Sequence, residues 1–297
     1  MPTPQSAANR RGIVAMSLAM ASFIANDALV KYVSESLPAA QLIFIRGLFA
    51  TVLLLAVARA AGLLRPALGN DPGALRHLLH RPVLARSAVD AMATLAYLAS
   101  LFHMPIGNAT AITMATPLFI TLFAVLVWRE RVGGARWLAI ASGFVGVLLI
   151  VQPVADGFNA WALLCLLGTL LQTGRDLITR TIHTSVPSVL ITVATSVTVT
   201  LLAGLLTAVQ GWQAVTPQQL ALLTGASVFL SAAYYLVIVG MRSGDMSVIA
   251  PFRYSGLLFA LLVGWVVWGD VPNALAWVGI ALLVGAGLYV LRSERAG

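Results

Sequence analysis

The chain has 297 residues, of which 60% are hydrophobic and only 9% are charged. A soluble domain of this length carries many more charged side chains, so the composition excludes a soluble globular protein and predicts a membrane protein with several crossings. The formal net charge of +8 does not indicate nucleic-acid binding, because the basic residues separate hydrophobic segments instead of forming a patch.

Ten hydrophobic segments are suited to cross a bilayer, which requires about 20 mostly apolar residues per helix. Turn signals rich in Pro, Gly and Asn separate these segments. The first segment follows Arg10 and Arg11, as in a signal peptide, but its length favours a retained helix. The expected helices span residues 12–33, 39–58, 83–103, 109–127, 136–151, 160–181, 188–209, 219–240, 247–267 and 274–291.

The positions of the basic residues predict the orientation of these helices. Arginines are frequent in every second loop, whereas residues 152–159 and 210–219 contain no Lys or Arg. Since positively charged loops remain on the cytoplasmic side, both termini are predicted to be cytoplasmic. The expected location is the inner membrane of a bacterial cell.

The two halves of the chain repeat one polar pattern. Asp27, Lys31 and Pro38 are matched 149 positions later by Asp176, Arg180 and Pro187. Trp128, Glu130 and Trp137 are matched 140 positions later by Trp268, Asp270 and Trp277. An odd number of crossings per repeat places the second repeat upside down, an arrangement typical of carriers with alternating access. We expect an all-α membrane protein with inverted five-helix repeats at residues 12–152 and 153–291, flanked by segments 1–11 and 292–297.

Charged residues inside the predicted helices are candidates for function, because burying a charge in a bilayer is costly. Asp27 and Arg46 are expected at similar depth in the outer half of the membrane, where they are placed to pair. Asp176 and Arg253 are expected to share a depth in the inner half. The alternative is local neutralisation at i,i+4 spacing, within the pairs Asp27–Lys31, Arg86–Asp90 and Asp176–Arg180.

Two sets of candidate residues follow from these charges and from polar or aromatic residues near them. The predicted substrate-binding residues are Asn26, Arg46, Asp90, Tyr97, Tyr234, Arg253 and Tyr254. The predicted residues for a gate or for proton coupling are Asp27, Lys31, Arg175 and Asp176. No metal site and no cofactor are expected, and the single cysteine, Cys165, cannot form a disulfide within one chain.

Several motifs resemble those of one transporter family. They are Asn26-Asp27 with Lys31-Tyr32, Gln41 with Arg46-Gly47, Pro117 with Trp128-Arg129-Glu130, Ala250-Pro251-Phe252-Arg253-Tyr254, and Trp268-Gly269-Asp270. Over nearly its whole length the chain resembles the EamA family of the drug/metabolite transporter superfamily, and the first and fourth motifs resemble its branch of S-adenosylmethionine and riboflavin uptake carriers. Asp270 departs from the family pattern, which usually has Glu there. The resemblance implies a ten-helix carrier with a central cavity lined by both repeats.

The predicted function is secondary transport of a small polar organic metabolite by alternating access, with uptake of riboflavin or S-adenosylmethionine as the first expectation. Export of amino acids or related metabolites is the alternative within the same class. A channel, a scaffold and a membrane-embedded enzyme are the alternatives outside it. The sequence has no motif typical of a catalytic site and no phosphate-binding loop, which argues against an enzyme and against a primary pump. The expected partners are a small-molecule substrate and the lipid bilayer, with a monomer or homodimer as the assembly.

Overall fold

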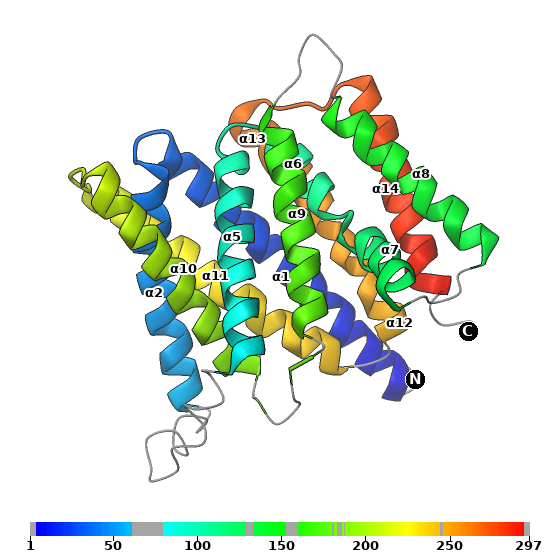
Figure 1. The fold of residues 1–297 in the computed structure, drawn as a ribbon, viewed down its shortest axis with the longest axis horizontal. Coiled ribbons are helices and arrows are strands. Elements are labelled where there is room, and N and C mark those ends of the chain that lie inside the picture. Colours follow the sequence, from blue (N-terminus) through cyan, green and yellow to red (C-terminus); the bar gives the residue numbers. More distant parts are fainter. Residues whose placement is uncertain are drawn as a thin grey trace.

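The computed structural model describes residues 4–60, 80–128, 133–152, 160–179, 181–182, 186, 188–243 and 246–293, and every regular element in these ranges is a helix (Figure 1). The first repeat contains α1 (Pro4–Ser34), α2 (Ala39–Ala60), α5 (Arg81–Leu101), α6 (Ile106–Thr113), α7 (Thr116–Trp128) and α8 (Gly134–Val151). The second contains α9 (Ala160–Thr179), α10 (Ser188–Gln210), α11 (Pro217–Ser243), α12 (Met246–Ile249), the 3-10 helix η1 (Ala250–Tyr254), α13 (Ser255–Trp268) and α14 (Ala274–Ser293).

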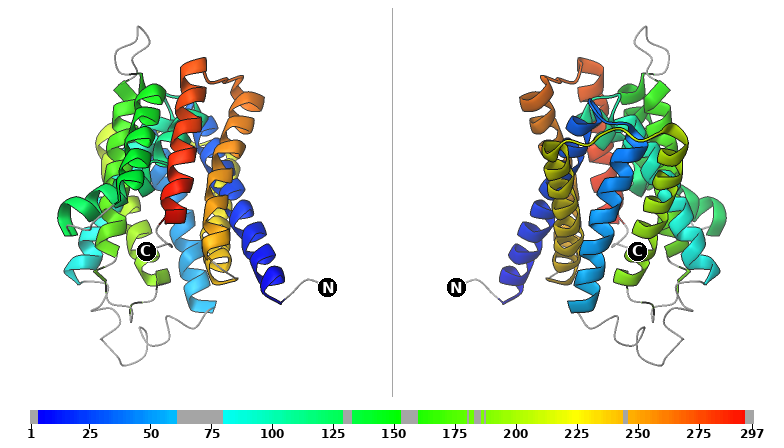
Figure 2. Two further views of the ribbon diagram at one scale, coloured as in Figure 1. Left: turned by 90° about the vertical axis from the view of Figure 1, so that its right-hand side faces the viewer. Right: turned by 90° about the vertical axis from the view of Figure 1, so that its left-hand side faces the viewer.

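These helices confirm the all-helical membrane fold and fit ten crossings. Within the described ranges, six helical segments are long and apolar enough to cross a membrane, and two further apolar helices are shorter. The helices α5 and α9 belong to neither group, and each carries an arginine and an aspartate along its length. The start of α1 and the end of α14 point to the same side of the bundle, which we call the terminal side (Figure 2).

Two of the ten crossings are interrupted near a proline, where the sequence predicted one continuous helix each. In the fourth crossing, Pro117 has no N–H to donate to the Thr113 carbonyl, and the Thr116 hydroxyl donates to that carbonyl instead, at 2.7 Å. The helix therefore ends at Thr113 and resumes as α7. In the ninth crossing, Pro251 lies in the 3-10 turn between α12 and α13.

The contacts between helices follow the two-fold relation of the two repeats. Each of three contacts has a counterpart in which the two repeats are exchanged: α1 with α11 and α9 with α5, α2 with α11 and α10 with α5, α1 with α13 and α9 with α7. Three more contacts join a crossing to its own counterpart: α2 with α10, α8 with α14, and the fourth crossing with the ninth through α6 and α13. The two repeats are thus interlocked, and most helices have their main neighbours in the other repeat.

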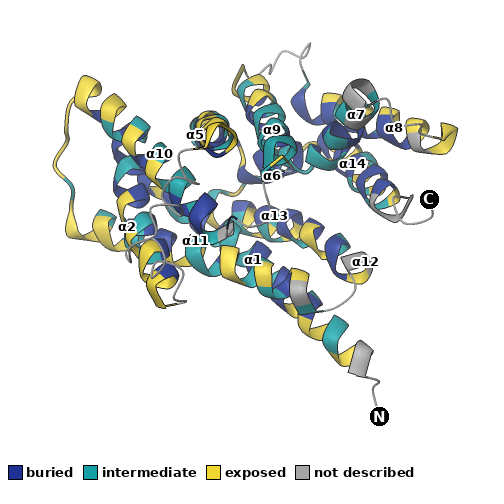
Figure 3. Ribbon diagram, turned by 60° about the horizontal axis from the view of Figure 1, so that its bottom comes forward, coloured by how far each residue is buried: buried dark blue, intermediate teal, exposed yellow. Residues whose placement is uncertain are grey.

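The helices expose residues on the outside of the bundle (Figure 3), and many of the exposed side chains are large and hydrophobic. Leu138, Val209 and Leu258 are 73%, 82% and 69% exposed, which suits contact with lipid chains. Where α8 crosses α14, Gly146 and Gly279 allow the backbones to approach closely, because a Cβ on either glycine would lie 2.6 Å from the carbonyl oxygen of the other.

Candidate functional site

Four of the predicted site residues meet where α1, α2 and α5 come together. The Tyr97 hydroxyl donates to Asp27 Oδ2 at 2.6 Å, and Asn26 Nδ2 donates to Asp27 Oδ1 at 2.8 Å. Arg46 Nη1 donates to Asn26 Oδ1 over a longer distance, 3.4 Å. The Asp27–Arg46 pairing expected from depth is therefore indirect, with Asn26 between the two charges. We call Asn26, Asp27, Arg46 and Tyr97 the Arg46 cluster.

The arginine of this cluster has unused hydrogen-bonding capacity. Arg46 is only 6% exposed, and its Nε has no hydrogen-bond partner. The long bond to Asn26 is the one hydrogen bond recorded for its guanidinium among the described residues. A buried donor without a partner is unfavourable, and a guanidinium offers five N–H donors in a planar fork. A ligand that brings oxygen acceptors would satisfy donors that the protein leaves unpaired.

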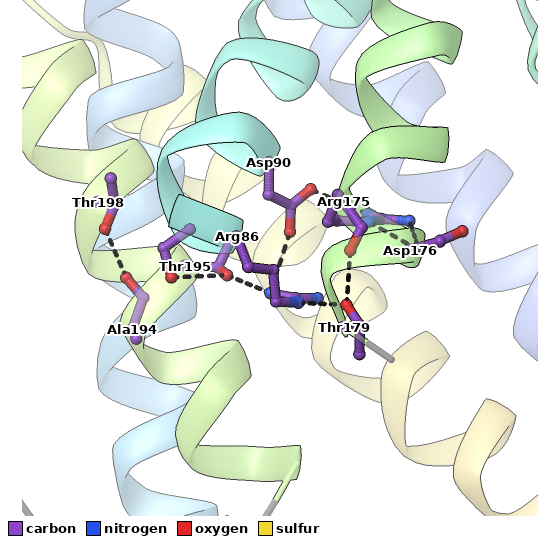
Figure 4. A network of polar contacts seen from close by, with 9 residues as sticks. Arg86, Asp90, Arg175, Asp176, Thr179, Ala194, Thr195 and Thr198 are labelled. Atoms are coloured by element: carbon purple, nitrogen blue, oxygen red, sulfur yellow. Dashed lines mark hydrogen bonds and ion pairs between the residues drawn. The ribbon is translucent and has the colours of Figure 1, made fainter. Parts of the chain in front are cut away.

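A second polar group lies between α5, α9 and α10 (Figure 4). Asp90 accepts from Arg175 Nη1 at 2.9 Å and pairs with Arg86 Nη1 at 3.5 Å, so one carboxylate bridges two arginines. Arg175 also holds Asp176 at 2.9 Å. The i,i+4 ion pair expected for Arg86 and Asp90 is therefore present, and Asp176 pairs with its neighbour Arg175.

Two threonines complete this group. Arg86 Nε donates to Thr179 Oγ1 at 2.9 Å, and Arg86 Nη1 donates to Thr195 Oγ1 at 2.6 Å (Figure 4). We call the six residues the Asp90 network: Arg86, Asp90, Arg175, Asp176, Thr179 and Thr195. Both of its arginines have partners on more than one helix, so the network ties α5 to α9 and α10.

Tyr234 of α11 connects the two groups in space. Its hydroxyl is close enough to interact electrostatically with Arg46 of the first group and with Asp90, Arg175 and Arg86 of the second. The Phe23 ring packs edge-on against Tyr234, with centroids 5.3 Å apart. Tyr234 is 39% exposed, so part of its aromatic side chain is not covered by the protein.

Lys31 lies one helical turn from Asp27 but does not bind it. Lys31 Nζ donates to the backbone oxygens of Leu101 and Met104, at 2.7 Å and 2.8 Å, at the end of α5. Its ammonium group also lies 5.5 Å from the ring centroid of Trp268, at the end of α13. This predicted gate residue therefore joins three segments on the side opposite the termini.

The remaining predicted residues lie elsewhere. Arg253 is on the 3-10 turn η1 and is exposed, and no contact with Asp176 is present. Tyr254 is buried against α14, and its hydroxyl occupies the space that a Cβ at Gly287 would need. That hydroxyl has no hydrogen-bond partner among the described residues. Arg180, named above as an alternative partner of Asp176, lies outside the described residues.

Three hydroxyl residues that bond the arginines of these groups were not expected from the sequence. Thr179 and Thr195 hold Arg86, and the Ser227 hydroxyl donates to the Arg46 backbone carbonyl at 3.0 Å. Each lies on a helix distant in sequence from its arginine, and hydroxyl residues are frequent in these apolar helices. Among the described residues, no group of three or more His, Cys, Asp or Glu side chains is arranged to hold a metal.

Comparison with known proteins identifies one family. The profile described as the EamA-like transporter family matches residues 10–152 and again residues 159–292. A riboflavin transporter from Rhizobium johnstonii is 36% identical over 219 residues, covering 74% of this chain and 70% of its own length. The pseudopaline exporter CntI of Pseudomonas aeruginosa is 26% identical over 96% of this chain and 98% of its own length.

More distant relatives extend the comparison. An S-adenosylmethionine uptake transporter from Rickettsia bellii is 25% identical over 96% of this chain and 94% of its own length. A solved crystal structure covers 98% of both chains with a TM-score of 0.64 and 18% identity, which is a likeness of fold. The matched relatives thus include both uptake carriers and an exporter.

Proposed function

Since the chain belongs to the EamA-like transporter family, we propose that it is a secondary carrier that takes up riboflavin by alternating access. The observation that carries this proposal is the unsatisfied Nε of buried Arg46, which interacts electrostatically with the tyrosine Tyr234. The isoalloxazine ring of riboflavin is flat, is uncharged at neutral pH and has carbonyl oxygens along one edge. Such a ring offers a stacking face to an aromatic side chain and acceptors to an arginine.

The state of the carboxylates favours this substrate over S-adenosylmethionine. Asp27 accepts from Tyr97 and Asn26, Asp90 is held by two arginines, and Asp176 is held by Arg175. A sulfonium cation entering the region would therefore meet carboxylates that already have partners. The free capacity of the site consists of donors, which suit the carbonyl edge of riboflavin; the carboxylate of S-adenosylmethionine would use the same donors, but its sulfonium group would lack a free carboxylate.

We propose that the terminal side of the bundle faces the cytoplasm of a bacterial cell and that the opposite side faces outward. The support is the charge asymmetry of the loops, because arginines are concentrated in loops of one side and absent from residues 210–219 of the other. In this orientation Lys31 and Trp268 lie at the outer end of the carrier, and the Asp90 network lies in its inner half.

The test is uptake of labelled riboflavin, both by a riboflavin-auxotrophic bacterium without its own carrier and by proteoliposomes containing the purified protein. We expect saturable uptake that Arg46→Ala lowers by about 100-fold, as for loss of charge-assisted hydrogen bonds to a ligand. Arg59→Ala is the matched control, because Arg59 lies on the same helix and is exposed; its uptake should stay close to that of the parent.

The outcome that overturns the riboflavin proposal is a folded, reconstituted protein without riboflavin uptake above that of empty vesicles. Uptake of labelled S-adenosylmethionine in the same vesicles would make S-adenosylmethionine, and not riboflavin, the substrate. Resistance of overexpressing cells to toxic amino-acid analogues would reverse the direction of transport, in line with the relative named as an exporter.

A further inference from the structure

The side chain of Lys31 binds a helix end that needs a donor. The last carbonyl groups of a helix have no intrahelical partner, and a cation there satisfies them and interacts favourably with the helix dipole. Lys31 Nζ bonds the carbonyl of Leu101, the last residue of α5, and that of Met104 beyond it. Lys31 is 8% exposed, so this contact between α1 and the end of α5 is nearly closed to solvent.

The same ammonium group reaches the second repeat. It lies 5.5 Å from the Trp268 ring centroid, and Trp268 Nε1 donates to Glu35 Oε1 at 2.9 Å. The ends of α1, α5 and α13 are thereby joined around one lysine. Glu35 and Asp270 both attract Lys31 electrostatically, yet its two short hydrogen bonds go to carbonyl oxygens. These carboxylates offer the ammonium group other partners when the α5 contact breaks.

Further contacts close this end of the molecule. Gln152 Nε2 donates to Asn273 Oδ1 at 2.9 Å, which links the ends of α8 and α14. Gln41 Nε2 donates to the Gln213 carbonyl at 2.7 Å, which links α2 to the segment after α10. Both bonds join the first repeat to the second. A pocket of about 240 Å³ opens at the same end, between α6 and α13, with Asp270 in its lining.

The contact of Lys31 with α5 is one of two rungs between the same helices. Asp27 and Lys31 are four residues apart on α1, and their partners Tyr97 and Leu101 are four residues apart on α5. One helical turn therefore separates the Asp27–Tyr97 contact, in the Arg46 cluster, from the Lys31–Leu101 contact at the end of the bundle. A change at the Asp27–Tyr97 contact alters the distance between α1 and α5, and the Lys31–Leu101 contact depends on that distance.

We propose that Lys31 is the latch of an external gate, closed here against the end of α5 and against Trp268, and that a substrate contacting Asp27 and Tyr97 acts on this latch through α1 and α5. The orientation and the existence of a substrate rest on the proposed function; the closure at this end rests on the contacts of Lys31. In an open state the ammonium group moves toward Glu35 or Asp270, and the path from the outer pocket to the Arg46 cluster is free.

The test is the accessibility of a single cysteine to a membrane-impermeant maleimide added outside intact cells. Cys165 is the one native cysteine and is buried, so Cys165→Ala provides the background. Thr94→Cys is the reporter, because Thr94 lies on the face of α5 that also carries Asp90 and Tyr97. Gln210→Cys is the control, because Gln210 is exposed at the outer end of α10.

We expect Lys31→Met to raise the labelling rate of the Thr94 reporter by about tenfold, since loss of charge-assisted hydrogen bonds shifts a two-state equilibrium by that order. Lys31→Arg, which keeps the positive charge, should raise the rate much less. Trp268→Leu should raise it by a smaller factor than Lys31→Met, and Trp268→Phe, which keeps an aromatic ring, by less still. The Gln210 control should be labelled at one rate in every background.

Unchanged labelling of the Thr94 reporter in both Lys31→Met and Trp268→Leu overturns the latch. If Lys31→Met fails to fold, as judged by gel filtration, the Trp268 pair decides alone: equal rates for Leu and Phe overturn the proposal. The labelling requires no knowledge of the substrate. If riboflavin is not taken up but the labelling rates change as expected, the riboflavin proposal is rejected and the gate proposal is retained.

Discussion

The Arg46 cluster and the Asp90 network are built from the same residue types, but their polar groups are satisfied to different degrees. In the network, one buried carboxylate holds two arginines and two threonines complete the coordination of Arg86. In the cluster, Asp27 is well bonded, whereas Arg46 has a single long hydrogen bond and a buried Nε without a partner. Buried polar groups are normally satisfied, so an exception needs a reason.

We propose that this difference separates a structural role from a binding role. A complete ion-pair network holds helices together and offers a ligand no unpaired donors. An incomplete one is less favourable in the empty carrier, and a substrate with oxygen acceptors would complete it. Substitutions in the Asp90 network should therefore lower the amount of folded protein. Substitutions in the Arg46 cluster should instead lower the rate of transport.

The largest effect is expected for Asp90→Asn. Its side chain is 9% exposed, and without its charge Arg86 and Arg175 face each other with only Asp176 to balance them. Removing one partner of a buried ion pair costs about 3–5 kcal/mol. The measurement is the yield and thermal unfolding of the purified protein in detergent. Adding Arg86→Gln, which restores charge balance, should recover a large part of the loss; a double variant no more stable than Asp90→Asn would contradict the network as described.

Arg46→Gln should lower transport without lowering the stability of the protein. We expect uptake to fall by about 100-fold, because the donors that a ligand would use are removed. The stability should change by less than about 1 kcal/mol, because Arg46 makes only one long side-chain hydrogen bond. Uptake in proteoliposomes and thermal unfolding of the same preparation measure both. Strong destabilisation would make Arg46 a structural residue like those of the network.

Tyr97→Phe should have an intermediate effect on transport. The hydroxyl lost is the donor to Asp27 Oδ2 at 2.6 Å, and a hydrogen bond to a charged group corresponds to about tenfold in an equilibrium. Tyr235→Phe is the control on an exposed tyrosine of α11. In a double-mutant cycle with Asp27→Ala, the two losses should not add, because each variant removes one partner of the same hydrogen bond. Full additivity would show that the bond does not matter for transport.

The smallest effect is expected for Asp176→Asn. Asp176 is the sequence counterpart of Asp27, but its side chain is 37% exposed, and among the described residues its partner is the adjacent Arg175. Exposed ion pairs contribute at most about 1 kcal/mol. Thermal unfolding should therefore differ from that of the parent by only a few degrees, and a loss as large as that of Asp90→Asn would mean that the two carboxylates are equivalent.

Spacing of one helical turn predicted one of the two pairs that the described residues test, because Lys31, one turn from Asp27, bonds the backbone carbonyls of Leu101 and Met104 instead. The Arg86–Asp90 pair, one turn apart, is present at 3.5 Å. Depth in the membrane also brought Asp27 and Arg46 into one cluster, although Asn26 stands between them. These inferences required only the length of a helical turn and the order of the crossings.

Contacts that depend on which helices are neighbours could not be predicted in this way. The bond from Tyr97 to Asp27 requires α1 and α5 to approach each other, and the partners of Lys31 are backbone carbonyls that no residue type reveals. Arg253 looked equivalent to Arg46 because neither has an acidic residue within one turn. Its place on an exposed 3-10 turn follows from the helix break at Pro251, which sequence periodicity does not show.

The contacts of α2 with α10, α6 with α13 and α8 with α14 have an evolutionary consequence. When a crossing of one repeat packs on the equivalent crossing of the other repeat, the contact is the kind found across the two-fold axis of a homodimer. Two copies of a five-helix ancestor, inserted in opposite orientations, would have met through these same three contacts. In such a dimer every substitution occurs twice. A single chain carries no such constraint, and here Asp27 bonds a tyrosine whereas Asp176 bonds an arginine.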